Sequence, residues 1–142
     1  MPHIEQIPSD LAWQIRQQAM YPGNEQKDVK LEGDKDGIHF GLFDQNQLIS
    51  VVSWFPQNDA EDQFRKLATL EPFRNSGYGT LLVRYIIDFS ERESIKTLWC
   101  NARVTALNFY EKLGFAKTET TFSKDGIDYV IMQLGIHKQT KD

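Results

Sequence analysis

The segment "RNSGYGT", residues 74 to 80, decides the fold because it joins a strand pattern to a helix pattern. The run "QFRKLATL" (63–70) before it is typical of a strand, and residues 78–92 after it repeat apolar side chains at helical spacing. Backbone NH groups at the start of a helix favour an anion, and Gly77 and Gly79 let a bulky group approach the main chain. The segment is therefore either a tight turn or a cradle for phosphate groups.

Arg74 favours the phosphate interpretation, because a guanidinium three residues before Gly77 can donate two parallel hydrogen bonds to phosphate oxygens. A nucleotide-hydrolase loop would end in Gly-Lys-Ser/Thr, but Thr80 follows Gly79 directly. A dinucleotide loop would need a third glycine and a later acidic residue, and Ser76 permits only a loose match. The segment thus predicts a phosphate site without naming its ligand.

The flanking sequence predicts a mixed sheet flanked by helices. A strand, helix, strand and helix in that order between residues 63 and 114 imply two neighbouring parallel strands joined by a right-handed crossover. Two hairpins add antiparallel strands, since Asp-Gly at 125–126 favours a tight turn. The expected strands are residues 37–43, 47–55, 63–70, 97–102, 115–122 and 127–134. The expected helices run from a cap at Ser9 or Asp10 to Pro22, from Tyr78 to Arg92 with Leu81, Leu82, Tyr85, Ile86 and Phe89 on one face, and from a cap at Thr105 to Gly114.

Length and composition restrict the class of protein. A chain of 142 residues is the size of one domain, so we expect a single domain over residues 1–142. No apolar run approaches the roughly 20 residues needed to span a bilayer, and no basic tract accompanies the net charge of -4, so neither a membrane nor a nucleic-acid partner is expected. The negative charge slightly favours a cationic substrate.

The compartment and metal content follow from two further features. The first ten residues, "MPHIEQIPSD", carry no export leader, so a cytoplasmic location is expected. Cys100 is the only cysteine, which fits a reducing compartment and leaves no companion for a thiolate metal site. No bound metal is expected.

Two motifs carry a family resemblance. Arg74-x-x-Gly77-x-Gly79 after a strand resembles the acyl-CoA pyrophosphate loop of the GCN5-related N-acetyltransferases (GNAT), and "NARVTALNFYEKLGF" (101–115) is similar to the later segment of that family. One departure is that Glu71 precedes Pro72, where the family often has the proline first. The resemblance implies an α/β (α+β) fold: a mixed, largely antiparallel sheet with a central, splayed pair of parallel strands, flanked by helices.

The resemblance also implies a site for acetyl-CoA as cosubstrate. The backbone of the strand end would bind the pantetheine arm, and the glycine loop would hold the pyrophosphate. Two amides could serve the peptide-like groups of the arm, although each could instead be a cap or a surface residue. The implied cofactor-binding residues are Leu67, Ala68 and Thr69 for the arm, Arg74, Asn75, Ser76, Gly77, Tyr78, Gly79 and Thr80 for the pyrophosphate, and Asn101 and Asn108 for the amide contacts.

Tyr110 is the implied catalytic residue. A phenol with a pKa of about 10 can protonate the leaving thiolate when an amine attacks the thioester, although helical periodicity alone would place Tyr110 in the core. A backbone NH near Ala68 would polarise the carbonyl oxygen.

No general base is assigned. His39 is the only histidine in a predicted strand, but a packing role competes with proton transfer. Glu61 and Asp62 could act through a water or be solvated. Cys100 is explained as a small buried hydrophobe, since direct transfer needs no acyl-enzyme.

The resulting hypothesis is an N-acetyltransferase that moves acetyl from acetyl-CoA to a primary amine by direct attack in a ternary complex. The alternative is a non-catalytic acyl-CoA sensor or interaction domain on the same fold, and a binding module without CoA is a third. The acceptor, a small-molecule or protein amine, stays open, as do acyl-chain length and a homodimer formed through edge strands.

Overall fold

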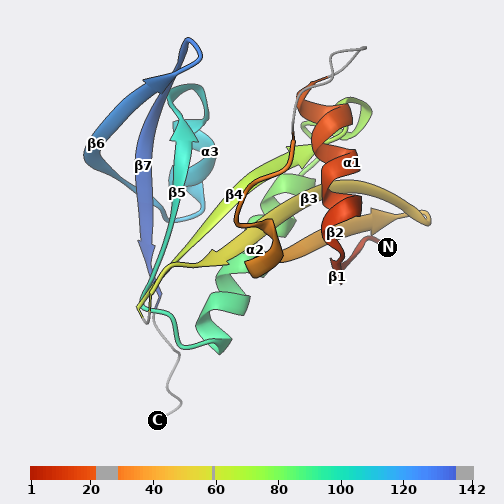
Figure 1. Cartoon of the computed structure of the whole chain (residues 1–142), viewed down its shortest axis with the longest axis horizontal. Coiled ribbons are helices and arrows are strands. Elements are labelled where there is room, and N and C mark those ends of the chain that lie inside the picture. The colour runs from red at the N-terminus through yellow and green to blue at the C-terminus, as the bar shows by residue number, and fades with distance from the viewer. Residues whose placement is uncertain (22–28, 59, 137–142) are drawn as a thin grey trace. The chain divides into compact units, whose positions relative to one another are not determined.

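The computed structural model describes residues 1–21, 29–58 and 60–136, and Figure 1 shows its helices and strands. The strands are β1 (His3–Ile7), β2 (Ile38–Asp44), β3 (Gln47–Pro56), β4 (Glu61–Thr69), β5 (Thr97–Arg103), β6 (Ala116–Lys124) and β7 (Ile127–Gly135). The helices are α1 (Ser9–Met20), α2 (Tyr78–Arg92) and α3 (Leu107–Lys112), together with the short 3₁₀ helices η1 (Asp34–Asp36), η2 (Glu71–Phe73) and η3 (Val104–Ala106).

The strands are hydrogen-bonded in the order β1-β2-β3-β4-β5-β7-β6. β4 and β5 are parallel, with residue pairs from Glu61–Thr97 to Gln63–Trp99. The pairs β1–β2, β2–β3, β5–β7 and β6–β7 are antiparallel. The expected fold class, a mixed and largely antiparallel α/β sheet with one parallel strand pair and flanking helices, is confirmed.

The chain divides into two compact units. The first comprises Met1–Phe55 and Phe64–Ile86, and the second comprises Pro56–Gln63 and Ile87–Asp142. Strand β4 and helix α2 therefore each contribute residues to both units. The single domain expected over residues 1–142 stays a prediction.

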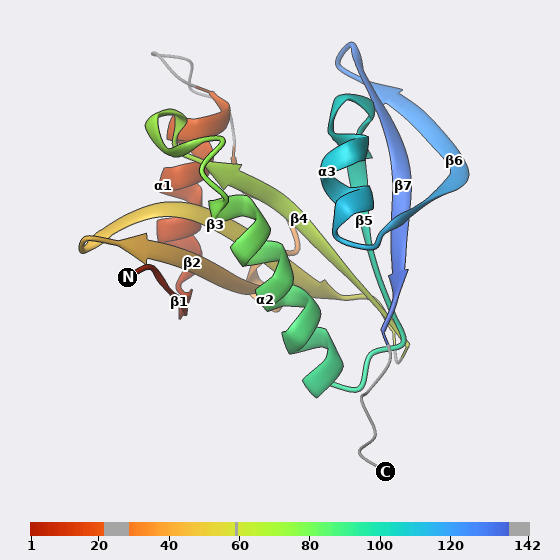
Figure 2. The same cartoon turned by 180° about the vertical axis from the view of Figure 1, so that it is seen from behind.

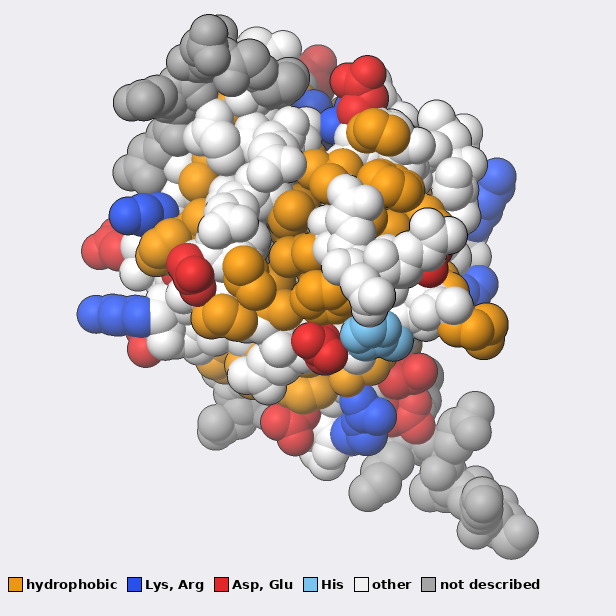
Figure 3. Space-filling model, turned by 90° about the vertical axis from the view of Figure 1, so that its right-hand side faces the viewer, with side chains coloured by type: hydrophobic (Ala, Val, Ile, Leu, Met, Phe, Trp, Pro, Cys, Tyr) orange, Lys and Arg blue, Asp and Glu red, His pale blue; other side chains and the backbone are white. Residues whose placement is uncertain are grey.

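In the first unit, α1 covers part of the sheet. Ala12, Ile15 and Ala19 lie three and four residues apart, so they share one helix face, and they pack with Val51 and Ala68. Other hydrophobic side chains pack against this core while staying partly exposed, and Figure 3 shows a face where hydrophobic side chains reach the surface. The partly exposed ones are Leu11, Met20, Phe43, Leu48 and Leu70.

The second unit contains β5, β7 and β6, with α3 beside β5 (Figure 2). Cys100 of β5 pairs with Met132 of β7, and both are buried. Leu98 and Ala102 are buried on the same face, because alternate strand residues share a face. The edge strand β6 is exposed along nearly its whole length.

Strand β4 contains a backbone irregularity that the sequence does not signal. Lys66 has φ 58°, a left-handed conformation that side chains other than glycine and asparagine rarely adopt. The residue pairs with β5 end before it, at Gln63. Beyond it, β4 bonds toward β3: Leu70 donates its NH to the Ile49 carbonyl at 2.9 Å, and the Ser50 hydroxyl donates to the Ala68 carbonyl at 3.1 Å.

Both predicted helix caps are wrong. Helix α1 has Pro8 at its N-cap, with no side-chain hydrogen bond, instead of Ser9 or Asp10. Proline carries no side-chain acceptor, so the helix begins without a capping side chain. Helix α3 has Ala106 at its N-cap instead of Thr105, because η3 runs directly into it.

Two other expectations differ from the structure. Leu81 was expected on the buried face of α2 but is 43% exposed, whereas Leu82, Val83 and Ile86 are fully buried. Successive helix side chains point about 100° apart, so the buried face is turned by roughly one residue. Strand β1 was not expected, because only Ile7 among its residues is buried and no alternation marks it.

Candidate functional site

The connection from β4 to α2 has an open backbone. Asn75 and Gly77 have φ 62° and 88°, and asparagine and glycine are the residues that adopt this left-handed conformation most readily. A Cβ placed on Gly77 would meet no atom within 4 Å. Gly79 lies in the first turn of α2, so Gly77 is the position where the loop needs a glycine. The main chain at Gly77 is therefore accessible to a bulky group.

Arg74 is bound to backbone on both sides of this loop. Its Nε donates to the Thr69 carbonyl at 3.1 Å, and its Nη2 donates to the Ala19 carbonyl at 2.6 Å. The carbonyl groups of the last helical turn lack partners within the helix and attract cations. Arg74 thereby connects the end of α1 to the end of β4, and its Nη1 donates to no residue that the structure describes.

Tyr78 fixes the start of α2. Its hydroxyl donates to Asp44 Oδ2 at 2.8 Å, and its ring contacts Phe73 edge-on with the centroids 6.2 Å apart. The hydrogen bond to Asp44 raises the pKa of Tyr78. The other loop side chains are open: Asn75 and Ser76 are exposed, and Thr80 is half-buried.

The first unit thus brings together ten of the predicted cofactor residues. They follow one another along the end of β4, η2 and the start of α2. Ala68 is buried and Leu67 is partly exposed, and the Thr69 hydroxyl lies 2.7 Å from the Ser50 hydroxyl. The set is Leu67, Ala68, Thr69, Arg74, Asn75, Ser76, Gly77, Tyr78, Gly79 and Thr80.

The second unit holds Tyr110 together with Asn101 and Asn108. Tyr110 is 9% exposed, and its ring packs edge-on against Phe109 and Phe115 at centroid distances of 4.9 and 5.9 Å. Burial raises the pKa of Tyr110, and nearby Cys100 raises it further, while Arg103 offsets part of the shift. The phenol is therefore protonated at neutral pH, the state that a general acid requires. Asn101 is half-buried on β5, and Asn108 is exposed on α3.

Cys100 is a buried thiol. It is 2% exposed, and burial raises its pKa to about 12. Because the thiolate is the nucleophilic form, the side chain is inert at neutral pH. This agrees with its interpretation as a small buried hydrophobe.

His39 belongs to a buried polar network in the first unit. Its Nε2 lies 2.9 Å from the Asp34 carbonyl, which can only accept, and its Nδ1 lies 2.7 Å from the Ser53 hydroxyl. The same hydroxyl accepts from Arg16 Nη2 at 2.8 Å, which leaves its hydrogen for His39. Both ring nitrogens are engaged, so the geometry favours packing over proton transfer.

Arg16 and Asp34 form the centre of that network, which the sequence did not predict. Arg16 Nη1 and Nη2 donate to the two carboxylate oxygens at 2.8 and 3.0 Å, and both residues are buried. Trp13 Nε1 and the Leu31 NH also donate to Asp34, each at 2.8 Å. Burial alone would raise the pKa of Asp34, but these hydrogen bonds and the charge of Arg16 lower it to about 2. The spacing of Arg16 from Ala12 and Ala19 placed it on the buried helix face and was the available signal.

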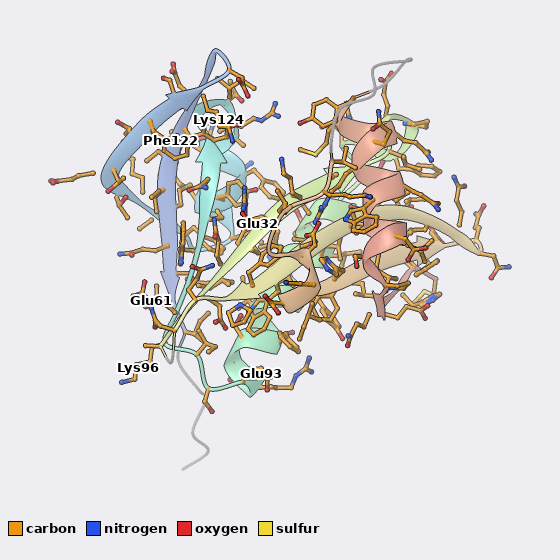
Figure 4. The ribbon with its side chains drawn as sticks, viewed as in Figure 1. Glu32, Glu61, Glu93, Lys96, Phe122 and Lys124 are labelled. Atoms are coloured by element: carbon orange, nitrogen blue, oxygen red, sulfur yellow. The ribbon has the colours of Figure 1, made fainter. Side chains whose placement is uncertain are left out.

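Asp62 is a buried acid in the second unit. It is fully buried, and neither carboxylate oxygen has a hydrogen-bond partner among the described residues. Burial raises its pKa to about 6; the nearby NH of Gln57 opposes this shift and Glu93 adds to it. That NH donates to the Glu61 carbonyl at 3.2 Å. Figure 4 shows Glu61, Glu93 and Lys96 at the same end of this unit. An enclosed carboxyl is poorly placed to act through a water.

Neither a candidate metal cluster nor a membrane-spanning helix is present in residues 1–21, 29–58 and 60–136. No group of three or more histidine, cysteine, aspartate or glutamate side chains there could hold a metal ion. None of the helices among the described residues is long and apolar enough to cross a membrane.

Comparisons with known proteins agree with this geometry. The model of the acetyltransferase (GNAT) domain matches residues 14–136. The Bacillus subtilis protein YitI, described as an uncharacterized N-acetyltransferase, is 26% identical over 141 residues, which cover 93% of this chain and 95% of YitI.

Solved structures show the same fold. The ribosomal-protein-S18-alanine N-acetyltransferase of Escherichia coli has a TM-score of 0.78 and 25% identity, with 100% of this chain and 98% of that chain covered. A GNAT acetyltransferase of Elizabethkingia anophelis with acetyl-CoA bound has a TM-score of 0.72 and 19% identity over 94% and 97% of the two chains. The fold and the family match define an acyl-transferring enzyme. The chain belongs to the GNAT family, and it is an acetyltransferase that uses acetyl-CoA as cosubstrate.

Proposed function

We propose that this enzyme transfers acetyl from acetyl-CoA to a primary amine by direct attack in a ternary complex. The observation that carries the proposal is the open, left-handed main chain at Gly77 directly before α2. Helix-start NH groups at such a position suit the pyrophosphate. The residues from Asn75 to Thr80 would hold it, and Arg74 would add charge through its Nη1 group.

The pantetheine arm would lie on the backbone of Leu67, Ala68 and Thr69. The Ala68 and Thr69 carbonyls already accept from Ser50 and Arg74, so their NH groups and second lone pairs would serve the arm. Asn101 and Asn108 would supply amide contacts from the second unit.

The chain's groups have distinct roles in the reaction. A backbone NH near Ala68 would stabilise the carbonyl oxygen as the amine nitrogen forms its bond to the carbonyl carbon. Tyr110 would donate its proton to the sulfur as the carbon–sulfur bond breaks, which gives free CoA and the acetylated amine. The amine proton would leave to solvent, because both ring nitrogens of His39 are engaged, Asp62 is enclosed and Glu61 is itself open to solvent.

The second candidate function is a non-catalytic acyl-CoA sensor on the same fold. The observation in its favour is that neither His39 nor Asp62 offers an accessible basic atom. A sensor would bind acetyl-CoA without acetylating any amine.

The remaining parts of the proposal concern partners and location. The acceptor is a small-molecule or protein amine, and β6 is an exposed edge strand through which a homodimer could form. Sedimentation of the purified chain would show whether it forms a homodimer. A cytoplasmic location stays a prediction, to be checked by cell fractionation.

The decisive experiment compares binding with turnover. Acetyl-CoA should raise the melting temperature, and an amine panel should release free CoA thiol. Tyr110→Phe should lower kcat about 10²- to 10⁴-fold, the usual contribution of a general acid, while the acetyl-CoA-induced thermal shift is kept. Tyr129→Phe removes a hydroxyl from the same unit as a control. A sensor would show the shift without thiol release, and equal loss of binding and turnover would make Tyr110 structural.

A further inference from the structure

Arg65 is a half-buried cation on β4 in the first unit. Ala68 packs against α1, and the guanidinium of Arg65 lies close enough to Arg16 and Asp34 to feel both charges. Two strand residues three positions apart normally face opposite sides. The left-handed Lys66 between them changes that alternation, so Arg65 and Ala68 both face α1.

Arg65 forms no hydrogen bond or ion pair with any residue in the described ranges. The buried carboxylate of Asp34 already accepts from Arg16, Trp13 and the Leu31 NH. The charges of Arg16 and Asp34 cancel, so Arg65 leaves one uncompensated positive charge among the described residues of this cluster.

A second polar atom of the same cluster also lacks an acceptor. Nε of the fully buried Arg16 has no hydrogen-bond partner among the residues that are described. Buried donors nearly always have an acceptor. The guanidinium of Arg65 and the Nε atom of Arg16 both lack one among the described residues. Glu32, labelled in Figure 4, is exposed on the segment before η1 and forms no ion pair with a described residue. The cluster therefore lacks acceptor oxygens, which an anionic ligand would supply.

The half-burial of Arg65 is costly without such a ligand. Burial lowers the pKa of Arg65, and the charge of Arg16 lowers it further, while Asp34 offsets part of the shift. A guanidinium nevertheless stays protonated at neutral pH. A half-buried cation near other charges, without an ion-pair partner among the described residues, is a candidate for ligand binding.

We propose that Arg65 recognises an anionic group on the acceptor, so that the substrate is a small amine that also carries a carboxylate or a phosphate. This rests on the proposed amine acetylation. A guanidinium fork matches the two oxygens of a carboxylate. Arg65 lies three positions before Ala68, where the thioester would lie, and three residues of extended strand span at most about 10 Å. An arginine side chain and a small acceptor together span that length. The cluster of Arg16, Asp34 and Arg65 is therefore positive, whereas the whole chain carries a net charge of -4.

The test compares matched amines by thiol release. Amino acids are set against their carboxamides, and phosphoethanolamine against ethanolamine, so that carboxylate and phosphate are distinguished. The wild type should prefer the anionic member of at least one pair. Arg65→Gln should lower kcat/KM for that member about 10- to 100-fold and leave the neutral member within about twofold. Arg65→Lys should be intermediate, because it keeps the charge and loses the fork.

Control variants and a binding assay distinguish recognition of the anionic group from a loss of stability and from a loss of turnover. Arg84→Gln makes the same charge change at an exposed position of α2 and should alter neither amine. The melting temperature of Arg65→Gln should equal or exceed that of the wild type, whereas a structural arginine would lower it. Titration calorimetry of the same amines into CoA-saturated protein reads recognition without turnover. No preference for an anionic member in either assay, or equal loss on both members, overturns the proposal; binding preference without thiol release overturns only the acetylation.

Discussion

The two units keep buried polar groups in opposite states. In the first unit, Arg16 and Asp34 are buried as a hydrogen-bonded ion pair, and the pKa of Asp34 is lowered to about 2. In the second unit, burial raises the pKa of buried acids instead: that of Asp62 to about 6 and that of Cys100 to about 12. The difference arises because the first unit supplies donors to its carboxylate, whereas burial dominates in the second.

The contrast fits a division of labour. A unit that fixes ions with oriented donors is suited to bind charged groups such as a pyrophosphate or an acceptor anion. A unit in which burial raises the pKa of acidic groups is suited to supply a proton, as proposed for Tyr110. Substitutions that remove the charge of a buried acid in either unit test this comparison most directly.

The largest effect is expected from breaking the ion pair. Asp34→Asn leaves Arg16 charged and unpaired in the interior and should lower the free energy of unfolding by about 3–5 kcal/mol. The folded-state pKa of Asp34 lies below its ordinary value of 3.8, so its stabilisation is present above pH 4 and is lost as the pH falls toward 2. Urea unfolding at pH 7 and pH 3 measures both effects. Asp36→Asn, exposed on η1, is the control, and a loss no larger than the control's would mean that the pair contributes nothing.

A smaller effect of opposite sign is expected in the second unit. The pKa of Asp62 is raised above 3.8 in the folded state, so the folded protein binds the proton more tightly and loses stability as the pH rises from about 4 to 6. Asp62→Asn keeps the neutral shape and should raise the free energy of unfolding by roughly 1–2 kcal/mol at pH 8, with little change at pH 4. Thermal melts of this variant and of the exposed Asp88→Asn at both pH values provide the measurement. Destabilisation at pH 8 would show that the ionised carboxylate is satisfied.

The smallest effects are expected at two left-handed backbone positions. Lys66→Gly should stabilise the first unit, and Gly77→Ala should destabilise it, each by about 1 kcal/mol, because a left-handed backbone strains any residue with a Cβ. Gly77→Ala should also weaken acetyl-CoA binding in a titration. Gly126→Ala is the control, because Gly126 also has a left-handed backbone with no atom within 4 Å of an added Cβ but lies in the late hairpin. A stable Gly77→Ala variant with unchanged acetyl-CoA affinity would contradict the role given to the open loop.

The elements with clear periodicity could be predicted from the sequence. The expected strands 37–43 and 47–55 leave residues 44–46 for a turn, and Gln45 and Asn46 do adopt the left-handed conformation that such a turn needs. The glycine loop was also recognised, because glycine and arginine at these positions have specific uses. What these residues bind stays a prediction.

Features decided by tertiary contacts could not be predicted. Lysine gives no sign of the left-handed backbone at Lys66, because this residue type rarely adopts that conformation. The hydrogen bond from Arg74 to the Ala19 carbonyl, 55 residues earlier in the chain, has no signal in the sequence. Arg65 is a similar case, because only its position near Arg16 shows that its charge is uncompensated.

The buried state of Cys100 has a practical consequence for measurement. Disulfide reagents react with thiolates, and the chain's only cysteine is a protonated, enclosed thiol. The folded enzyme should therefore contribute almost no background in an assay that detects the free thiol of CoA. One equivalent of protein thiol should become reactive only on unfolding, so the same reagent would report the integrity of each variant.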